Sequence, residues 1–330
     1  MRSDLFKIKV AIAGTGKIVP ESIEALTMTG YDVVSIWGPH KEKAIPIAER
    51  YNINHVCGSY EDLLISGVDF VYIALVNTVH FDYAVKALLA GVNVLLEKPF
   101  CSNASQAEYL ASLCKEKGLY LFETISNIYQ PAWTIVKQYL PEIGKIKMFQ
   151  ASFSQYSSRY DAYLAGDICA VFDPEYEGGA LRDLNVYNLH LAVDLFGAPD
   201  QVIYRANKGY NGVDTSGTVI LKYPDIIAVC SASKDASAPS GVLIQGENGW
   251  IRINGMPNVL QEVEVNRCSH VGETFSPNRY TSRLCHQFEE MRRIYLNGEY
   301  TQMQRKLSHT VRVMSTLNKC ADEIYIQEKG

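Results

Sequence analysis

Short, continuous apolar runs alternate with longer segments of helical spacing through the first 125 residues or so. The apolar runs, each typical of a buried strand, are residues 7–13, 32–37, 70–75, 93–96 and 120–122. The segments between them are predicted helices, because capping residues stand at their starts and glycines at several of their ends. This alternation predicts an α/β domain over residues 1–125, built on a parallel, doubly wound sheet. Such sheets bind ligands at the carboxyl ends of their strands.

The pattern changes near Gly144, where polar and apolar residues begin to alternate as they do in half-buried strands. Residues 145–153, 217–223 and 226–231 show this alternation, and helical spacing returns over residues 180–196 and from 281 to the end. We therefore expect residues 126–330 to form an α+β domain on a mostly antiparallel, open sheet.

The predicted helices can cover only one face of this second sheet. The other face then needs a cover of its own, and a second copy of the chain is the usual one. We therefore expect a homodimer or a homotetramer in which residues 126–330 carry the contact between subunits.

Composition narrows the functional class. The chain has 330 residues, of which 47% are hydrophobic and 20% charged, with a net charge of −5 and dispersed Lys and Arg. Dispersed basic residues argue against a nucleic acid or an anionic membrane as the main partner. No apolar run is long enough for a membrane span, and early charged residues argue against a secretory signal. The eight cysteines form no C-x-x-C pair and have no zinc-site spacing, so we expect free thiols in the cytoplasm and no metal.

A glycine-rich turn, Gly14-Thr15-Gly16, lies directly between the first predicted strand and helix. Gly14 would allow the tight turn, and Gly16 would let the backbone approach a pyrophosphate at the helix N-terminus. Val19 stands where a third small residue is usual. This context favours a Rossmann-type dinucleotide site, although a structural tight turn without a nucleotide remains an alternative.

The end of the second predicted strand bears on the choice of cofactor. An acidic residue there would bind a ribose 2′-hydroxyl and repel a 2′-phosphate, but this chain reads Trp37-Gly38-Pro39-His40-Lys41. His40 and Lys41 could pair with a phosphate, and Trp37 could lie against the adenine. We therefore expect NADP(H) to be preferred, with NAD(H) possible.

Four segments in this order resemble the glucose–fructose oxidoreductase, inositol dehydrogenase and MocA (Gfo/Idh/MocA) family. They are Gly14–Ile18 (GTGKI), Tyr72–His80 (YIALVNTVH), Glu97–Pro99 (EKP) and Gly178–Asp183 (GGALRD). The resemblance extends from Lys7 to about Gln327. It implies an NAD(P)-dependent oxidoreductase that acts on CH–OH groups.

The candidate cofactor site combines the glycine turn, the end of the second strand and the segments that resemble the family. Its members are Gly14, Thr15, Gly16, Lys17, Ile18, Trp37, Gly38, His40, Lys41, Leu75, Val76, Asn77, His80, Glu97, Lys98 and Asn127. The resemblance places Lys98 beside both the nicotinamide and the reacting carbon, where its charge could polarise the substrate oxygen.

The remaining catalytic candidates lie on the helix predicted for residues 180–196. On an α-helix, Asp183, Tyr187 and His190 share one face. Many relatives carry Asp-x-Gly-x-His here, with the His as acid/base. Asn185 and Tyr187 replace the last two, as in the glucose–fructose oxidoreductase and dihydrodiol dehydrogenase branches. Tyr187 is thus the expected acid/base, with His190 as its rival.

The expected reaction is hydride transfer between a nicotinamide and a sugar, polyol or cyclic diol. A phenol titrates near 10 in water, so Tyr187 would need the charge of Lys98 nearby. Asp183 would hold the substrate or the lysine. Two alternatives stay open: a lyase or glycosidase that retains its cofactor and oxidises transiently, and a non-catalytic protein that senses nicotinamide or another ligand.

Overall fold

A computed structural model describes residues 7–268 and 271–327 and divides the chain into two compact units. Unit 1 comprises the chain up to Thr124 together with Ser282–Val311, and unit 2 comprises Ile125–Thr281 together with the residues after Val311. The boundary after Thr124 lies next to the one expected from the sequence. Residues 282–311 differ, because they belong to unit 1 and not to the second domain.

Unit 1 is built on a six-stranded sheet with the order β3-β2-β1-β4-β5-β6, and its described strands all pair in parallel. The strands are β1 (Ile8–Ala13), β2 (Tyr31–Trp37), β3 (His55–Val56), β4 (Phe70–Ile73), β5 (Asn93–Glu97) and β6 (Leu121–Thr124). The order reverses between β1 and β4, which is the switch point of a doubly wound sheet. The predicted α/β fold class is confirmed, and β3 is a short addition at one edge.

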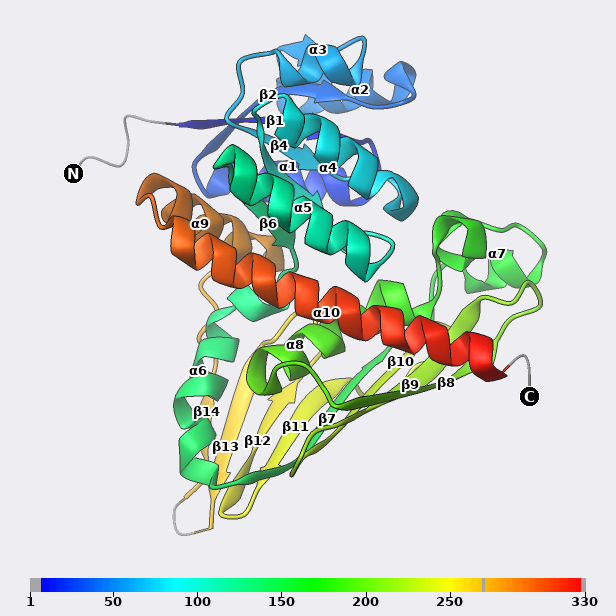
Figure 1. Cartoon of the computed structure of the whole chain (residues 1–330), viewed down its shortest axis with the longest axis vertical. Helices are drawn as coiled ribbons and strands as arrows, with labels where there is room; N and C mark the ends of the chain where they lie inside the picture. The colour runs from blue at the N-terminus through cyan, green and yellow to red at the C-terminus, as the bar shows by residue number, and fades with distance from the viewer. Residues whose placement is uncertain (1–6, 269–270, 328–330) are drawn as a thin grey trace. The chain divides into compact units, whose positions relative to one another are not determined.

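Most helices of unit 1 alternate with its strands along the chain, and Figure 1 shows them beside the sheet. They are α1 (Ile18–Met28), α2 (Lys41–Tyr51), α3 (Tyr60–Leu64), α4 (His80–Leu89), α5 (Ala104–Lys117), α9 (Arg283–Leu296) and the 3-10 turn η1 (Asn77–Val79). Local chemistry sets their bounds. The Asn103 side chain accepts the Gln106 N–H at the start of α5, and Gly118, with φ at +66°, ends it.

Helix α9 belongs to unit 1 because its aromatic residues pack into the core of the parallel sheet. Phe288 is fully buried and makes edge contacts with Tyr31 and Tyr72, and the Tyr295 ring lies 4.9 Å from that of Phe70. Fully burying a phenylalanine contributes about 2–3 kcal/mol to folding. Helical spacing after residue 281 predicted the helix, but it could not indicate which sheet the helix covers.

Unit 2 is built on an eight-stranded sheet with the order β14-β13-β12-β11-β7-β10-β9-β8. Its strands are β7 (Ile146–Ser154), β8 (Gln201–Lys208), β9 (Asp214–Lys222), β10 (Ile227–Ser233), β11 (Gly241–Gly246), β12 (Gly249–Asn254), β13 (Glu262–Arg267) and β14 (Glu273–Phe275). Strands β7 and β10 pair in parallel, and the other described pairs are antiparallel. This confirms the mostly antiparallel sheet.

The helical segments of unit 2 are few and mostly short. They are α6 (Pro131–Tyr139), α7 (Tyr160–Leu164), the π turn η6 (Leu181–Asn185), α8 (Val186–Phe196) and the 3-10 turns η2 (Asn127–Tyr129), η3 (Leu140–Ile143), η4 (Ala170–Phe172) and η5 (Pro174–Tyr176). Helix α10 (Tyr300–Gln327) gives its first part to unit 1 and the rest to unit 2.

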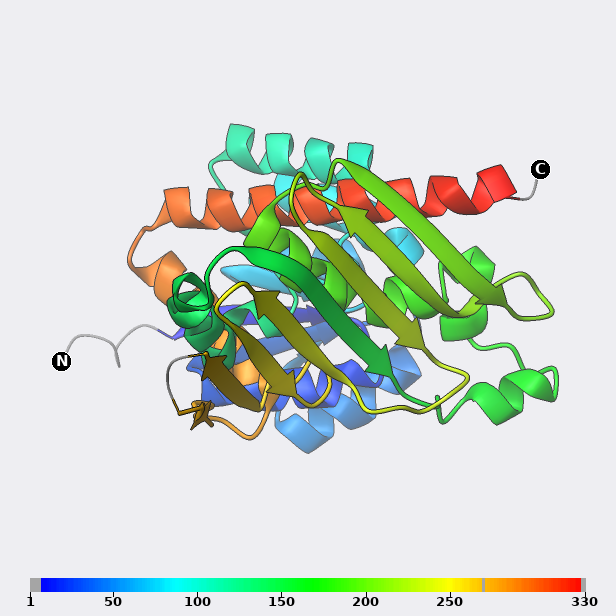
Figure 2. The ribbon, with the colours of Figure 1, turned by 90° about the horizontal axis from the view of Figure 1, so that it is seen from below.

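Helix α8 packs on one face of the second sheet. Its Phe196 ring makes an edge contact with Phe149 of β7, and residues 186–193 are all buried. The opposite face of the sheet, seen from below in Figure 2, carries the alternating partly exposed residues of the strands. Among the described residues, no helix is both long and apolar enough to cross a lipid bilayer.

Candidate active site

The turn after β1 has the shape that its glycines predict. Gly14 has φ at +138°, and a Cβ there would collide with the carbonyl oxygen of Ala74, which directly follows β4. The Gly14 N–H donates to the Trp37 carbonyl oxygen over 2.8 Å. Only glycine allows the chain to adopt this φ and to pass so close to the Ala74 carbonyl at the switch point of the sheet.

Gly16 has a different environment, which suits a ligand. It is exposed, and no atom of the described residues lies within 4 Å of a Cβ built on it. Helix α1 begins two residues later, and no side chain of the described residues caps it at Lys17. The backbone N–H groups of a helix N-terminus attract anions, so this turn fits a dinucleotide pyrophosphate. Val19, at the third motif position, is fully buried beneath the turn.

Residues after β2 face the same turn. A Cβ on Gly38 would lie 2.8 Å from the Thr15 methyl carbon, so the two turns are closely packed. The Trp37 side chain is largely buried and stacks on Tyr83, with ring centroids 5.5 Å apart. One ring face of Trp37 is therefore occupied by protein, and its contact with adenine stays a prediction.

His40 and Lys41 are exposed at the start of α2. The carboxylate of Glu42 lies 3.5 Å from the His40 ring, and both side chains are more than half exposed. An exposed pair of this kind contributes little to stability, so His40 and Lys41 can still approach a phosphate.

The segment after β4 forms the η1 turn, which starts at Asn77. The buried His80 ring lies 3.1 Å from the Leu75 carbonyl oxygen and 2.9 Å from that of Pro99. His80 thus connects this turn to the loop after β5. Sequence reasoning placed His80 in the cofactor site, and the structure gives it a positioning contact with that loop. Val76 is partly exposed beside it.

The Glu97-Lys98-Pro99 loop leaves the carboxyl end of β5. Glu97 is buried, and its Oε1 accepts hydrogen bonds from the Tyr72 hydroxyl at 2.7 Å and the Thr124 hydroxyl at 2.8 Å. Burial and the Glu97 carboxylate raise the pKa of Tyr72 well above its ordinary value, so this phenol remains a donor. Lys98 is half-buried, and its peptide bond to Pro99 is cis. The hydrogen bonds of Glu97 therefore fix the residue before Lys98 at the carboxyl end of the sheet.

In unit 2, the segment expected to be one α-helix has two parts. Residues 181–185 form a π turn, and α8 starts at Val186. A π turn bonds residue i to i+5, one residue further than an α-helix does, so the segment is not the continuous α-helix that the sequence predicts. The shared face of Asp183, Tyr187 and His190 stays a prediction. The amide of Asn185 donates to the Cys230 carbonyl oxygen, and that of Asn188 donates to the Ser231 carbonyl oxygen. These bonds attach the segment to β10.

Asp183 has a partner that the sequence analysis did not identify. Its Oδ2 lies 2.7 Å from Nζ of Lys234, the residue after β10. The Lys234 side chain is 3% exposed and that of Asp183 30% exposed. A signal for Lys234 was present in the sequence, because it continues the inward positions Ala228, Cys230 and Ala232.

Asp214 is a second buried carboxylate beside the π turn. Its Oδ2 accepts hydrogen bonds from the Leu181 N–H and the Tyr204 hydroxyl, both over 2.6 Å. Burial raises the pKa of Asp214, while these two bonds and the charge of Lys234 oppose the rise. A Cβ on Gly179, whose φ is +116°, would collide with the Asp214 carboxylate, which explains the glycine before the turn.

Tyr187 and His190 are both buried on α8. The Tyr187 ring lies 5.9 Å from that of Phe153, and its carbonyl oxygen accepts the Asn127 amide over 2.8 Å. The Asn127 Oδ1 accepts the Ile128 N–H. Asn127, predicted as a cofactor ligand, therefore fixes the backbone of α8 at Tyr187.

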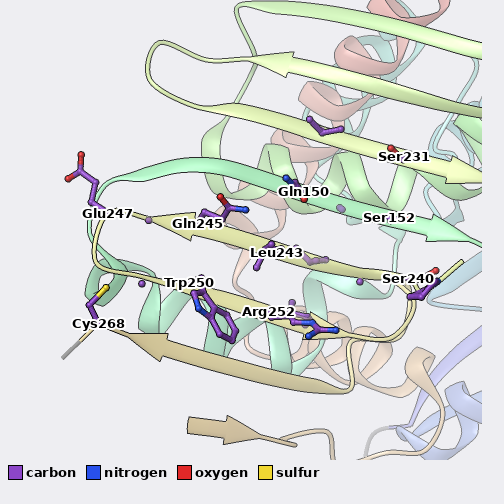
Figure 3. A pocket seen from close by; sticks show the side chains of 18 residues that line it. Gln150, Ser152, Ser231, Ser240, Leu243, Gln245, Glu247, Trp250, Arg252 and Cys268 are labelled. Atoms are coloured by element: carbon purple, nitrogen blue, oxygen red, sulfur yellow. The ribbon is translucent and has the colours of Figure 1, made fainter. Parts of the chain in front are cut away.

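A hollow of about 960 Å³ lies on the face of the second sheet opposite α8. Gln150, Leu243, Trp250 and Arg252 are among its lining residues, and Figure 3 shows them on adjacent strands. None of the lining residues is a predicted catalytic residue. This hollow therefore belongs to the open sheet face, and the chemistry expected of the chain lies elsewhere.

Two family profiles match the chain. The oxidoreductase family with an NAD-binding Rossmann fold (GFO_IDH_MocA) matches residues 8–124, and the GFO/IDH/MocA C-terminal domain matches residues 141–252. The scyllo-inositol 2-dehydrogenase (NADP(+)) IolU of Bacillus subtilis is 38% identical over 252 residues, which are 75% of this chain and 76% of IolU. A trans-1,2-dihydrobenzene-1,2-diol dehydrogenase of Xenopus tropicalis is 29% identical over 254 residues, 74% of each chain.

Solved structures share the fold. The 3-ketoreductase KijD10 from Actinomadura kijaniata, in complex with TDP-benzene and NADP, superposes with a TM-score of 0.81 at 23% identity. That match covers 96% of this chain and 97% of the other. A levoglucosan dehydrogenase in complex with NADH and levoglucosan has a TM-score of 0.84 at 16% identity and covers 98% of each chain.

Proposed function

Because this chain belongs to the Gfo/Idh/MocA oxidoreductase family, we propose that it is a dehydrogenase or reductase that uses NADP(H) in preference to NAD(H). Its substrate class is a sugar, polyol or cyclic diol with a reacting CH–OH or carbonyl group. The observation that carries the proposal is the exposed Gly16 backbone at the N-terminus of α1, at the switch point of the sheet. The relative named as an NADP-dependent scyllo-inositol dehydrogenase supports both the cofactor and the polyol class.

The residues have separate roles in the proposed reaction. The bound nicotinamide supplies or accepts the hydride. Lys98 polarises the substrate oxygen with its positive charge, and Tyr187 donates or accepts the hydroxyl proton. Asp183 holds the substrate through its exposed portion. His190, on the same helix as Tyr187, is the alternative acid/base.

Turnover on a panel of inositols, aldoses and cyclic diols, followed by NADPH absorbance, tests this function. We expect Lys98→Ala and Tyr187→Phe each to lower kcat/KM at least about 100-fold, because each removes a group that acts on the reacting oxygen. NADPH binding, measured by its fluorescence, should be retained. Lys86→Ala is the control, because Lys86 is an exposed lysine of unit 1 paired with Glu61 at 3.2 Å.

Other outcomes would identify a different function. Cofactor that survives dialysis, together with elimination or hydrolysis products and no net NADPH change, would indicate a lyase or glycosidase. Binding of NADPH without turnover on any panel member would indicate a sensor. Full activity of Lys98→Ala would contradict the assigned role of this lysine.

The open face of the second sheet supports a homo-oligomer within the same proposal. Ile203 and Ile220 are about 40% exposed on neighbouring strands of this face, and Leu243 and Trp250 line its hollow. Exposed apolar side chains that gather on one face of a sheet often mark a subunit interface. We propose that a second copy of the chain covers it.

A further inference from the structure

The ion pair between the buried Lys234 and the partly exposed Asp183 adds a residue to the proposed reaction. We propose that Lys234 is a positioning residue, which holds the Asp183 carboxylate and the glycine turn before it in the geometry that the reaction requires. This inference rests on the proposed function, because Asp183 is the group through which Lys234 would act.

The Lys234 ammonium is enclosed by groups that match its chemistry. Its Nζ donates to Oδ2 of Asp183 over 2.7 Å and to the Val171 carbonyl oxygen over 2.8 Å. It also lies 4.7 Å from the centroid of the Phe172 ring. A buried ammonium is costly unless it is paired, and these contacts with a carboxylate, a carbonyl and an aromatic face compensate its charge.

The backbone of Lys234 is fixed as firmly as its side chain. Its N–H donates to the Thr215 carbonyl oxygen over 2.8 Å, and its own carbonyl oxygen accepts the Ser157 N–H over 2.9 Å. These bonds attach the residue to β9 on one side and to the segment after β7 on the other. The ammonium therefore has little freedom to follow Asp183, and Asp183 must instead take the position that Lys234 defines.

The Val171 carbonyl oxygen links Lys234 to the turn that precedes Asp183. It accepts the Gly179 N–H over 3.1 Å in addition to the Lys234 ammonium. The Gly179 carbonyl oxygen in turn accepts the Asp183 N–H over 3.2 Å. Lys234 thus constrains Asp183 through both its carboxylate and its backbone.

Exposure distinguishes Asp183 from the other carboxylate near Lys234. Asp214 is 9% exposed and its Oδ2 already accepts from Leu181 and Tyr204, whereas the Asp183 side chain is 30% exposed. Asp214 therefore stabilises the start of the π turn, where it accepts the Leu181 N–H. The Asp183 carboxylate is bonded to the buried Lys234 ammonium and is also partly accessible to solvent. This arrangement is expected of a carboxylate that is kept in one orientation to bind a ligand.

A double-mutant cycle on kcat tests the inference with Lys234→Met, Asp183→Asn and the double variant. We expect Lys234→Met to lower kcat about 10-fold or more, with a smaller change in KM. In the Asp183→Asn background, the same substitution should change kcat by less than about 2-fold, because it acts through the carboxylate. Lys147→Met is the control, because Lys147 forms an exposed pair with Glu247 at 2.9 Å in the same unit.

Amide hydrogen exchange gives a second readout that is independent of turnover. Lys234→Met should accelerate exchange over residues 178–185, while strands β11 and β12 keep their wild-type exchange. Unchanged exchange over 178–185, or equal kcat losses in both backgrounds, would overturn the positioning role. A wild-type chain that turns over no panel member would instead overturn the proposed function, so the two failures are distinguishable.

Discussion

His40 and Lys41 illustrate how single exposed residues can set cofactor choice. Both follow β2, where the chain has no carboxylate before Glu42, and Glu42 lies against His40. A ribose 2′-phosphate carries charge that a lysine can bind and that an acidic residue would repel. In the proposed function, the preference for NADP(H) would thus depend on side chains that contribute little to the fold.

Lys41→Ala should weaken NADPH binding about 5- to 10-fold and leave NADH binding unchanged. The expected loss corresponds to about 1–1.4 kcal/mol, which is within the net contribution of a typical hydrogen bond. Fluorescence titration with both cofactors measures it. Lys43→Ala is the matched control, because Lys43 is exposed on the same helix two residues further on. An equal effect on NADH would contradict the assignment.

At the scale of elements, the β1–α1 turn assigns different tasks to its two glycines. Gly14 sits against the Ala74 carbonyl in a conformation that other residues rarely adopt, whereas the space beside Gly16 is open among the described residues. Gly14 is therefore required by the fold, whereas we expect Gly16 to be required by the proposed dinucleotide.

Alanine substitutions should separate these tasks. Gly14→Ala should destabilise the protein by more than about 2 kcal/mol, because a backbone carbonyl must move. Gly16→Ala should keep the wild-type Tm and weaken NADPH binding, since the added methyl group occupies the approach to the helix N-terminus. Thermal unfolding and fluorescence titration provide the two readouts. A stable Gly14→Ala variant, or tight NADPH binding by Gly16→Ala, would contradict this division.

At the scale of the whole molecule, the proposed homo-oligomer depends on the open face of the second sheet. The other face packs against α8 through residues such as Phe149, which leaves the open face for the proposed second copy. Leu243 and Trp250 line the hollow of the open face, and exposed apolar side chains of this kind favour burial against a partner.

Leu243→Glu should shift the chain to a smaller oligomer, because it places a charge at the centre of this face. Light scattering after size-exclusion chromatography measures the mass. Ile65→Glu is the control, since Ile65 is 82% exposed and belongs to unit 1, not to the sheet of unit 2. A wild-type monomer would refute the proposed oligomer, and an unchanged Leu243→Glu oligomer would refute the proposed face.

The sequence by itself determined the elements and the chemistry that depends on near neighbours. Strand and helix periods identified both sheet types, and Gly14 and Gly16 identified the turn, because these signals act within a few residues of the chain. The Glu97-Lys98-Pro99 loop was likewise identified from these three consecutive residues. Its place after β5 is confirmed, whereas the role of Lys98 remains a proposal.

Only the tertiary structure decided which distant residues meet. Lys234 pairs with Asp183, 51 positions away, and His80 holds the Pro99 carbonyl, because strand register and burial fix side-chain directions. Residues 181–185 form a π turn where the sequence predicts the start of an α-helix, and this turn is bonded at both ends to buried groups of the sheet. Helix α9 belongs to unit 1 because its aromatic face packs on the parallel sheet. The periodicity of a helix indicates that one face is buried, but it does not indicate which sheet covers that face.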